Sequence, residues 1–469
     1  MGLGQELKSR FIAIVGENHA LTQPSDIAPH LIESRDLYHG LSDLVLKPDS
    51  VGQVSAILRL ASDTGTPIVP QGGNTGHVGG QIPDRSGNSV VLSLSRMNRI
   101  RDLDPVGNTV TVEAGVVLKR LQEAADGVDR FFPLSLGAEG SCQIGGNLSS
   151  NAGGTAVLAY GNTRDLCLGL EVVLPTGEVM HGLKRLRKDN TGYDLRDLFI
   201  GAEGTLGIIT AATLKLFPRP RGRSVAFIGT RSPDHALQLL SRAKASGTLT
   251  GFELIARVGM EFAARHIEGA RDPLEAPHAW YVLAEFSSSR SDEDAGDAME
   301  LFLGAALEGG EADDAVIAQS GQQAAAFWRL REELSWAQKP EGGSIKHDIS
   351  VPVAAIPAFI NEADAAVDAL IPGVRFCTFG HMGDGNLHYN ISQPIGADKA
   401  AYLARWHEVN ALVHDIVGKH DGSISAEHGI GQLKRGELAR FKDPVALDLM
   451  RRIKNSFDPA GIMNPGKVL

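Results

Sequence analysis

The sequence predicts an α+β protein that is divided into two or three domains. A chain of 469 residues is longer than one hydrophobic core usually supports. In the first half of the chain, helical and strand patterns alternate around loops that are rich in glycine. After the linker-like segment Pro218-Arg-Pro-Arg-Gly, strands and helices follow one another in pairs, which predicts a separate α/β layer.

The composition is that of an ordinary globular protein, with 43% hydrophobic and 22% charged residues. The net charge of −11 leaves no basic footprint, so nucleic acid is not an expected partner, and it argues mildly against docking on an anionic membrane. No apolar run has the length of a membrane span, and the N-terminus lacks a signal-peptide core. Three widely spaced cysteines form no disulfide framework and no cysteine zinc site. We therefore expect a cytoplasmic protein without a transmembrane segment.

Local patterns predict the individual elements. Apolar residues recur at helical spacing over residues 50–61, with Ser50 as the N-cap and Gly65 as the stop. The other elements expected in the first half are strands at 67–70, 90–94 and 109–112, a helix near 117–125 and a mostly β region at 168–216. Those expected in the second half are strands at 225–228 and 281–286, helices at 233–245 and 292–307, and a last helix with a Pro/Gly-rich tail within 443–469.

The 54 glycines of the chain gather in clusters, and the first cluster directly follows a predicted strand. The run Pro70-Gln-Gly-Gly-Asn-Thr-Gly-His-Val-Gly-Gly matches neither a Rossmann fingerprint nor a Walker loop. Its backbone N–H groups can still converge on a diphosphate, and Asn74 and Thr75 add side-chain donors. The alternative is a tight turn between strands, but five glycines in eleven residues exceed what a turn needs.

Two further segments have the composition of loops that line a polar cofactor. Residues 136–154 combine Gly, Ser and Asn with few apolar side chains, which disfavours both helix and strand. Residues 201–210 read Gly-Ala-Glu-Gly-Thr-Leu-Gly-Ile-Ile-Thr, and they end in a strand that could present its backbone to a flavin ring.

The C-terminal half carries two clusters of histidine and glutamate. In Phe379-Gly-His-Met-Gly-Asp-Gly-Asn-Leu-His-Tyr-Asn, the spacing of His381 and His388 would place them on opposite faces of one strand, but the intervening Gly-Asp-Gly-Asn predicts a turn that lets both rings point to one centre. A pair of histidines near a turn is more often structural than metal-binding. The presence of Glu427 and His428 in the second cluster favours a metal-binding or catalytic site instead. Two imidazoles and one carboxylate are typical of zinc sites that stay open to substrate, although manganese or cobalt also suits them.

The three glycine-rich segments together resemble the FAD-binding domain of flavoproteins of the vanillyl-alcohol oxidase type. From about residue 45 onward the chain resembles the FAD-linked D-2-hydroxy acid dehydrogenases, most closely the D-2-hydroxyglutarate dehydrogenase family. The resemblance implies a two-subdomain FAD-binding domain over residues 1–217 and an α+β substrate domain with an antiparallel sheet over residues 218–425. Residues 426–469 are then expected to return to the FAD-binding domain.

Relatives that attach FAD covalently often carry a histidine directly after the paired glycines of the first loop. Asn74 holds that position in this sequence, and we interpret His77 as a loop residue near the phosphates. We therefore expect noncovalent FAD. The residues that the resemblance assigns to FAD binding are Gln71, Gly72, Gly73, Asn74, Thr75, Gly76, His77, Leu136, Gly137, Ser141, Gly145, Gly146, Asn147, Asn151, Gly153, Gly204, Ile209 and Asn464.

The resemblance also implies roles for the histidine and glutamate clusters. His381, His388 and Glu427 match the family's ligands for a divalent metal, usually zinc, and His428 matches its proposed catalytic base. Hydride would leave C2 of the substrate for flavin N5, while the 2-hydroxyl group, acidified by the metal, gives its proton to the base.

Four residues match substrate-binding positions of the family: Arg331, Ser335, Lys346 and Asn390. Arg331 can hold a carboxylate with a bidentate contact, although taken alone it would be interpreted as a surface salt bridge on a helix. Ser335 keeps the hydroxyl group of the threonine found in mitochondrial enzymes. Lys346 separates the chain from the D-lactate dehydrogenase and glycolate oxidase branches.

We therefore expect FAD- and metal-dependent oxidation of D-2-hydroxyglutarate, a small 2-hydroxy dicarboxylate, to 2-oxoglutarate. The expected electron acceptor is an electron-transfer flavoprotein or a quinone-linked carrier. The sequence leaves the oligomeric state open, and a homodimer is one alternative. One alternative is a D-lactate or D-malate dehydrogenase of the same family. Another is a flavin-binding subunit without turnover, against which the intact set of metal ligands, base and anion-binding residues argues.

Overall fold

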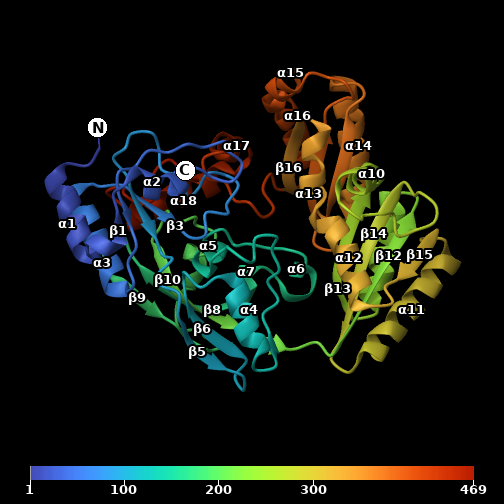
Figure 1. Ribbon diagram of the computed structural model, residues 1–469, viewed down its shortest axis with the longest axis horizontal. Coiled ribbons are helices and arrows are strands. Elements are labelled where there is room, and N and C mark those ends of the chain that lie inside the picture. The colour runs from blue at the N-terminus through green and yellow to red at the C-terminus, as the bar shows by residue number, and fades with distance from the viewer. Residues whose placement is uncertain (1) are drawn as a thin grey trace. The chain divides into compact units, whose positions relative to one another are not determined.

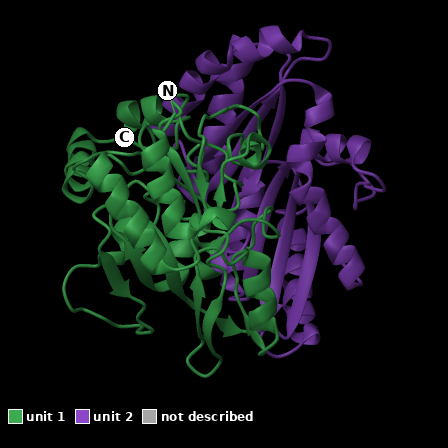
Figure 2. Ribbon diagram, turned by 60° about the vertical axis from the view of Figure 1, so that its left-hand side comes forward, with its two compact units in different colours: residues 1–153, 160–218, 427–469 green, residues 154–159, 219–426 purple. Residues whose placement is uncertain are grey.

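The chain forms two compact units in the computed structural model, which describes residues 2–469. The first unit comprises residues 1–153, 160–218 and 427–469, drawn in green in Figure 2, and the second comprises residues 154–159 and 219–426, drawn in purple. The short insert 154–159 has no counterpart in the domain boundaries expected from the sequence. Because both chain ends belong to the first unit, the second unit is a long insertion into it.

The first unit contains two main sheets, most of whose strands are labelled in Figure 1. A four-stranded sheet has the order β1-β2-β4-β3, with β2 and β3 parallel to β4, and a five-stranded antiparallel sheet has the order β5-β6-β10-β8-β9. The strands are β1 (Ala20–Leu21), β2 (Val45–Leu46), β3 (Ile68–Gln71), β4 (Val90–Ser93), β5 (Ile100–Asp104), β6 (Thr109–Glu113), β8 (Cys167–Val173), β9 (Val179–Gly182) and β10 (Ile208–Lys215), with a separate pair of β7 (Arg130–Phe131) and β11 (Phe217–Pro218).

Helix α3 shows how the local sequence sets an element of the first unit. It begins after Ser50, whose side chain accepts a hydrogen bond from the backbone N–H of Gln53 at 3.4 Å, and it ends at Gly65 in the left-handed conformation, as the sequence predicts. The other helices are α1 (Gln5–Val15), α2 (Pro24–Ile27), α4 (Leu118–Asp126), α5 (Ile144–Ser149), α6 (Val157–Tyr160), α7 (Thr163–Leu166), α8 (Arg196–Phe199), α17 (Arg435–Phe441) and α18 (Pro444–Phe457), beside α3 (Val51–Thr64).

The C-terminal segment is tied to the sheets of the first unit by its backbone. The N–H of Ile68 donates to Ile462 O, and the N–H of Asn464 donates to Ile68 O, each at 2.8 Å, so the tail extends the parallel sheet beside β3. The Lys454 ammonium group donates to Thr205 O at 2.7 Å and to Met463 O at 2.9 Å. The last residues of the chain therefore support the loops that follow β3 and precede β10.

The second unit is built on one seven-stranded sheet of the order β15-β12-β14-β13-β17-β18-β16. All its pairings are antiparallel. Strand–helix alternation does not give a parallel sheet here, because α9 connects β12 to β13 and β14 is inserted between these two strands. The strands are β12 (Gly222–Thr230), β13 (Leu249–Ala256), β14 (Trp280–Ser288), β15 (Asp314–Ile317), β16 (Ser344–Ser350), β17 (Arg375–His381) and β18 (Asn386–Ser392).

Helices pack on both faces of this sheet. The helices α9 (Pro233–Ala245), α11 (Asp292–Gly309), α14 (Ile356–Leu370) and α16 (Trp406–Lys419) contribute to the apolar core on one face. The helices α10 (Arg257–His266), α12 (Gly321–Glu332) and α13 (Leu334–Ala337) contribute to a second core on the other face, and α15 (Lys399–Ala404) precedes α16. Across residues 2–469, no helix combines the length and the apolar character that crossing a membrane requires.

Candidate functional site

The first glycine loop follows β3 and passes so close to the backbone of another segment at Gly73 that a side chain does not fit there. A Cβ atom on Gly73 would lie 2.1 Å from Ser141 O, and Asn74 adopts the left-handed conformation with φ 56°. The side chain of Asn74 donates to Pro29 O at 3.0 Å and to Ile32 O at 2.9 Å, which fixes the loop from outside. The loop therefore packs directly against the second glycine-rich segment. Such close packing is expected of a loop that binds its ligand through backbone N–H groups.

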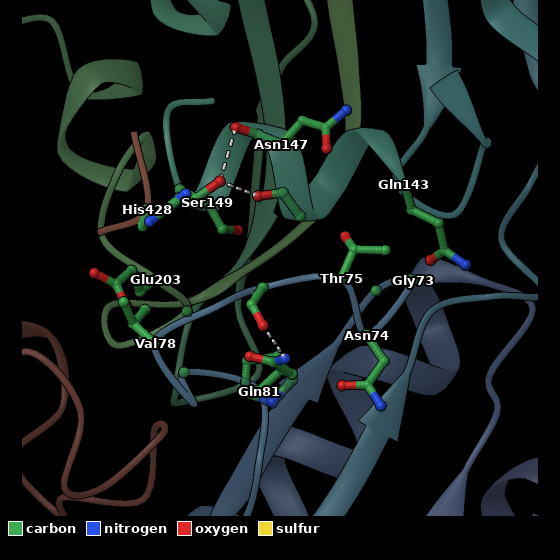
Figure 3. Close-up of a pocket in the computed structure, with 17 residues that line it drawn as sticks. Gly73, Asn74, Thr75, Val78, Gln81, Gln143, Asn147, Ser149, Glu203 and His428 are labelled. Atoms are coloured by element: carbon green, nitrogen blue, oxygen red, sulfur yellow. Dashed lines mark hydrogen bonds between the residues drawn. The ribbon is translucent and has the colours of Figure 1, made fainter. Parts of the chain in front are cut away.

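This loop forms one wall of a pocket within the first unit, shown in Figure 3. The pocket spans about 690 Å³ of space, part of which is open solvent. Its lining residues are Pro70, Gly72, Gly73, Asn74, Thr75, Gly76, Val78, Gly80, Gln81, Gln143, Gly146, Asn147, Ser149, Ser150, Glu203, Gly204 and His428. A smaller neighbouring pocket adds Gln71, Leu94, Ala114, Gly145, Gly207, Ile208 and Ile209.

The polar groups of the pocket suit a diphosphate and a flavin. Among residues 2–469, no acceptor receives a hydrogen bond from the backbone N–H groups of Gly73 to Gly76. Consecutive free N–H groups of this kind form an anion-binding nest. The buried Oε1 of Gln143, which also lines the pocket, has no hydrogen-bond partner in the described part of the chain. The residues therefore fit FAD, with its negatively charged diphosphate and its polar ring edge.

Most residues expected to bind FAD line one of these two pockets. They are Gln71, Gly72, Gly73, Asn74, Thr75, Gly76, Gly145, Gly146, Asn147, Gly204 and Ile209. The pocket linings do not include His77, Leu136, Gly137, Ser141, Asn151, Gly153 or Asn464. Asn464 instead donates from Nδ2 to Gly80 O at 2.9 Å and to Glu203 O at 2.8 Å, so it holds two pocket loops in place. Asn151 accepts from the backbone N–H of Arg164 at 2.9 Å.

Glu203 is a pocket residue that the sequence analysis does not single out. It is half-buried, and its two carboxylate oxygens accept hydrogen bonds from the backbone N–H groups of Ile430 (2.7 Å) and Gly431 (2.8 Å). Burial raises the pKa of its carboxyl group, against the opposing effect of these two N–H donors. Glu203 thereby anchors the turn that directly follows Glu427 and His428. Its only signal in the sequence is a charged residue inside a glycine-rich loop.

His428 lines the FAD pocket, where its ring contacts that of His77. The two ring centroids are 5.0 Å apart in an edge-to-face arrangement. His77 is thus a loop residue whose ring packs against the expected base. Figure 3 shows His428 and Glu203 at the same end of the pocket. If His428 is the general base, it therefore acts on a group bound next to this pocket.

In the second unit, one face of the sheet carries the residues expected to bind the metal and the substrate. The strand register places Lys346 opposite Asn390, Phe379 opposite His388, and Glu253 opposite His381. Residues that pair directly in antiparallel strands, and residues two apart along a strand, share a face. The predicted hairpin is present, since β17 ends at His381 and β18 begins at Asn386. The rings of His381 and His388 converge, with centroids 5.5 Å apart.

Arg331 reaches this face from α12, and it is buried rather than on the surface. Its guanidinium carbon lies 4.7 Å above the centre of the Phe379 ring, and its Nε donates to Glu253 Oε2 at 2.7 Å. Its Nη2 is buried and has no hydrogen-bond partner within residues 2–469. The interpretation of Arg331 as a surface ion pair is therefore wrong. A buried donor without an acceptor indicates a ligand, and an anion suits a guanidinium group best.

The other expected substrate residues lie on neighbouring elements. The Lys346 ammonium group, on β16, donates to the backbone carbonyl of Ser335 at 3.3 Å. Ser335 is exposed on α13, and Asn390 is buried on β18. Lys346 and Ser335 thus form one polar cluster with Asn390, the cross-strand neighbour of Lys346.

His381, His388 and Glu427 meet a first requirement for metal binding. Each offers one ligand atom, and these atoms lie within 4.8 Å of one another. His381 presents Nδ1 to Glu253 Oε1 at 2.7 Å, so Nε2 is the ring nitrogen that would bind a metal. Glu427 directly follows Ala426, whose backbone N–H donates to Asp348 O at 3.4 Å. Two imidazole nitrogens and one carboxylate oxygen at this spacing fit a divalent cation that keeps open positions.

Two domain families match the sequence. The family described as FAD linked oxidases, C-terminal domain, matches residues 219–468, and the family described as FAD binding domain matches residues 42–182. The first match covers more than half of the chain and includes the whole seven-stranded sheet. The second covers the first glycine loop and helix α5.

Curated relatives align over nearly the whole chain. The mitochondrial D-2-hydroxyglutarate dehydrogenase of Arabidopsis thaliana is 38% identical over 98% of this chain and 81% of its own length. The D-2-hydroxyglutarate dehydrogenase of Xanthomonas citri is 39% identical over 90% of this chain and 88% of its own length.

Among solved structures, p-cresol methylhydroxylase with bound substrate superposes with a TM-score of 0.77 at 16% identity, over 100% of this chain and 98% of that chain. This likeness confirms the expected fold class. The fold is α+β, with a two-subdomain FAD-binding domain of the vanillyl-alcohol oxidase type, an antiparallel-sheet domain and a C-terminal segment that returns to the first unit.

Proposed function

This chain belongs to the FAD-linked oxidases and is an FAD-dependent dehydrogenase, and from this premise we propose that it oxidises D-2-hydroxyglutarate to 2-oxoglutarate. The observation that carries the choice of substrate is the buried Nη2 of Arg331, which has no partner among the described residues and lies on the sheet face that also bears Lys346. Two cations on one face suit a substrate with two carboxylates, as 2-hydroxyglutarate has.

In this proposal the chain's own residues position the substrate and move one proton. Arg331 and Lys346 bind the carboxylates, Asn390 donates or accepts a hydrogen bond beside them, and His428 accepts the proton of the 2-hydroxyl group. The glycine-loop pocket would hold FAD, which would supply the hydride acceptor for C2. His381, His388 and Glu427 would hold a divalent metal, which would supply a Lewis acid for the 2-hydroxyl group.

The proposal extends to the attachment of FAD, the identity of the metal, the electron acceptor and the cellular location. We propose that FAD is noncovalent, because Asn74 uses its side chain for two backbone carbonyls and carries no nucleophile. Zinc is the proposed metal, supported by the nitrogen and oxygen ligand set. An electron-transfer flavoprotein or a quinone-linked carrier is the proposed acceptor, in a cytoplasmic protein whose three cysteines are all unpaired.

The test is a panel of D-2-hydroxy acids with an artificial electron acceptor, run on protein that contains FAD and zinc. We expect D-2-hydroxyglutarate to give the highest kcat/KM, and Lys346→Ala to lower this value about ten- to a hundredfold, since a charge-assisted contact of about 1.5–3 kcal/mol is lost. His428→Ala should lower kcat with less effect on KM, because a base acts mainly in the transition state.

A matched control for Lys346 is Lys419→Ala. Lys419 is an exposed lysine of the same unit that pairs with Glu362 at 2.8 Å, and its loss should leave kcat/KM unchanged. FAD content should stay normal in Lys346→Ala and Lys419→Ala, because neither lysine lines the FAD pocket. A higher kcat/KM for D-lactate than for D-2-hydroxyglutarate, or wild-type kinetics of Lys346→Ala, would contradict the proposed substrate.

A further inference from the structure

Glu253 is a fully buried carboxylate in the middle of β13. One of its oxygens lies 2.7 Å from Nδ1 of His381, and the other accepts a hydrogen bond from Nε of Arg331 at 2.7 Å. The register of β13 and β17 places Glu253 directly opposite His381. A single carboxylate thus contacts both an expected metal ligand and an expected substrate-binding residue.

The contacts of Glu253 with His381 and with Arg331 each determine which atoms of the partner can bind a ligand. A carboxylate beside Nδ1 keeps the proton of the imidazole on that nitrogen, which leaves the Nε2 lone pair of His381 for a metal. The second oxygen engages only Nε of Arg331, so the rest of the guanidinium group stays available, and its Nη2 has no acceptor among the described residues. Glu253 therefore fixes both side chains and blocks the reactive edge of neither.

We propose that Glu253 is a positioning residue that sets the His381 tautomer for metal binding and orients the Arg331 guanidinium group toward the substrate carboxylate. The inference rests on the proposed function for the roles of His381 and Arg331. According to this inference, Glu253 couples metal binding at His381 to substrate binding at Arg331. Loss of the Glu253 charge should therefore weaken metal binding and substrate binding together.

A second buried carboxylate on the same sheet face provides a matched control. Glu285, on the neighbouring strand β14, also ties helix α12 to the sheet, since it accepts a hydrogen bond from Nε1 of Trp328 at 3.0 Å. It forms an ion pair with Arg223 as well, and it contacts none of the expected metal or substrate residues. If Glu253 served only to attach α12, Glu253→Gln and Glu285→Gln should have the same consequences.

The direct test measures zinc affinity by competition with a chromophoric chelator, on FAD-loaded protein that has been stripped of metal. The amide of Glu253→Gln can accept from His381 or from Arg331 but not from both, so we expect zinc affinity to fall about 10- to 100-fold. KM for D-2-hydroxyglutarate should rise in the same variant. Glu285→Gln should keep wild-type zinc affinity and KM, even if its melting temperature falls.

Wild-type zinc affinity in folded Glu253→Gln would overturn the inference. If that variant does not fold, the inference can still be tested on wild-type protein by measuring the ¹⁵N chemical shifts of the His381 ring. The His381 signals are those that disappear in His381→Gln. A protonated Nδ1 is expected, and a protonated Nε2 in the metal-free protein would refute the positioning role. Failure of the proposed function looks different, because wild-type protein would then bind no zinc or turn over no 2-hydroxy acid.

Discussion

Asp364 is a carboxyl group that the fold partly buries and that forms no ion pair within residues 2–469. It lies on α14 and accepts a hydrogen bond from the hydroxyl group of Tyr389 at 2.8 Å. Burial raises its pKa from 3.8 to about 6, against the opposing effect of the Tyr389 hydrogen bond. The folded protein therefore binds this proton more tightly than the unfolded chain does. The contribution of Asp364 to stability is greatest below pH 3.8 and is lost as the pH rises toward 6.

Replacement of Asp364 by asparagine should stabilise the protein at neutral and alkaline pH. The amide oxygen can still accept from Tyr389, and no charge remains to be buried, so we expect a gain of about 1–2 kcal/mol at pH 8 after allowance for partial solvation. This gain should shrink when the pH is lowered to 5. Melting temperatures of wild type and variant at both pH values provide the measurement. Asp368→Asn, at an exposed position on the same helix, is the control for the loss of one negative charge from α14.

At the scale of elements, α5 shows two adjacent glycines with different reasons to be glycine. A Cβ atom on Gly145 would lie 2.7 Å from the Cβ of Ala114, so close packing requires the absence of a side chain. A Cβ atom on Gly146 would meet no atom within 4 Å, and this residue lines the FAD pocket. Gly145 is thus needed for the fold, whereas Gly146 keeps space for a ligand.

We predict that Gly146→Ala stabilises the apoprotein and weakens FAD binding. Alanine favours a helix over glycine by about 0.5–1 kcal/mol, while its methyl group occupies pocket space. Melting of the apoprotein and titration of FAD by fluorescence quenching measure the two effects separately. Gly52→Ala on α3, which also meets no atom within 4 Å but lies outside the pocket, should stabilise without changing FAD affinity. Unchanged FAD affinity in Gly146→Ala would mean that the cofactor does not approach α5.

At the scale of the whole molecule, the two expected cofactors depend on different parts of the chain. All residues that line the FAD pocket belong to the first unit, and none of the three expected metal ligands, His381, His388 and Glu427, is among them. The pocket donors lie in the loop 72–80 and in residues 143–150, where helix α5 replaces the loop expected from the sequence, and neither histidine contributes to them. Binding of FAD should therefore not require the metal.

Chelation should accordingly abolish turnover of D-2-hydroxyglutarate and leave FAD bound. Flavin absorbance after removal of the chelator and the metal by gel filtration measures retention, and metal content is determined in the same sample. Zinc, manganese and cobalt added back one at a time would identify which ion restores activity. Release of FAD together with the metal would show that the two sites are not independent.

The sequence by itself determined the elements and motifs whose signals are local. The cap and stop of α3, the hairpin turn between His381 and His388, and the glycine loop after β3 are each encoded within about a dozen residues. Resemblance to known flavoproteins added the fold class and the residues expected to bind FAD. A backbone cradle is predictable in this way because glycine has few other uses at such density.

Only the tertiary structure decided the strand order of the second sheet, whose antiparallel character the resemblance already implied, and the contacts of Glu253, Glu203 and Asn464. Strand order depends on which strands meet, and strand–helix alternation alone is compatible with a parallel sheet. Glu253 and His381 are 128 residues apart, and Glu203 and Ile430 are 227 residues apart. A lone carboxylate in an apolar strand or a glycine loop carries no local pattern, because its meaning comes from the partner that folding brings within hydrogen-bond distance.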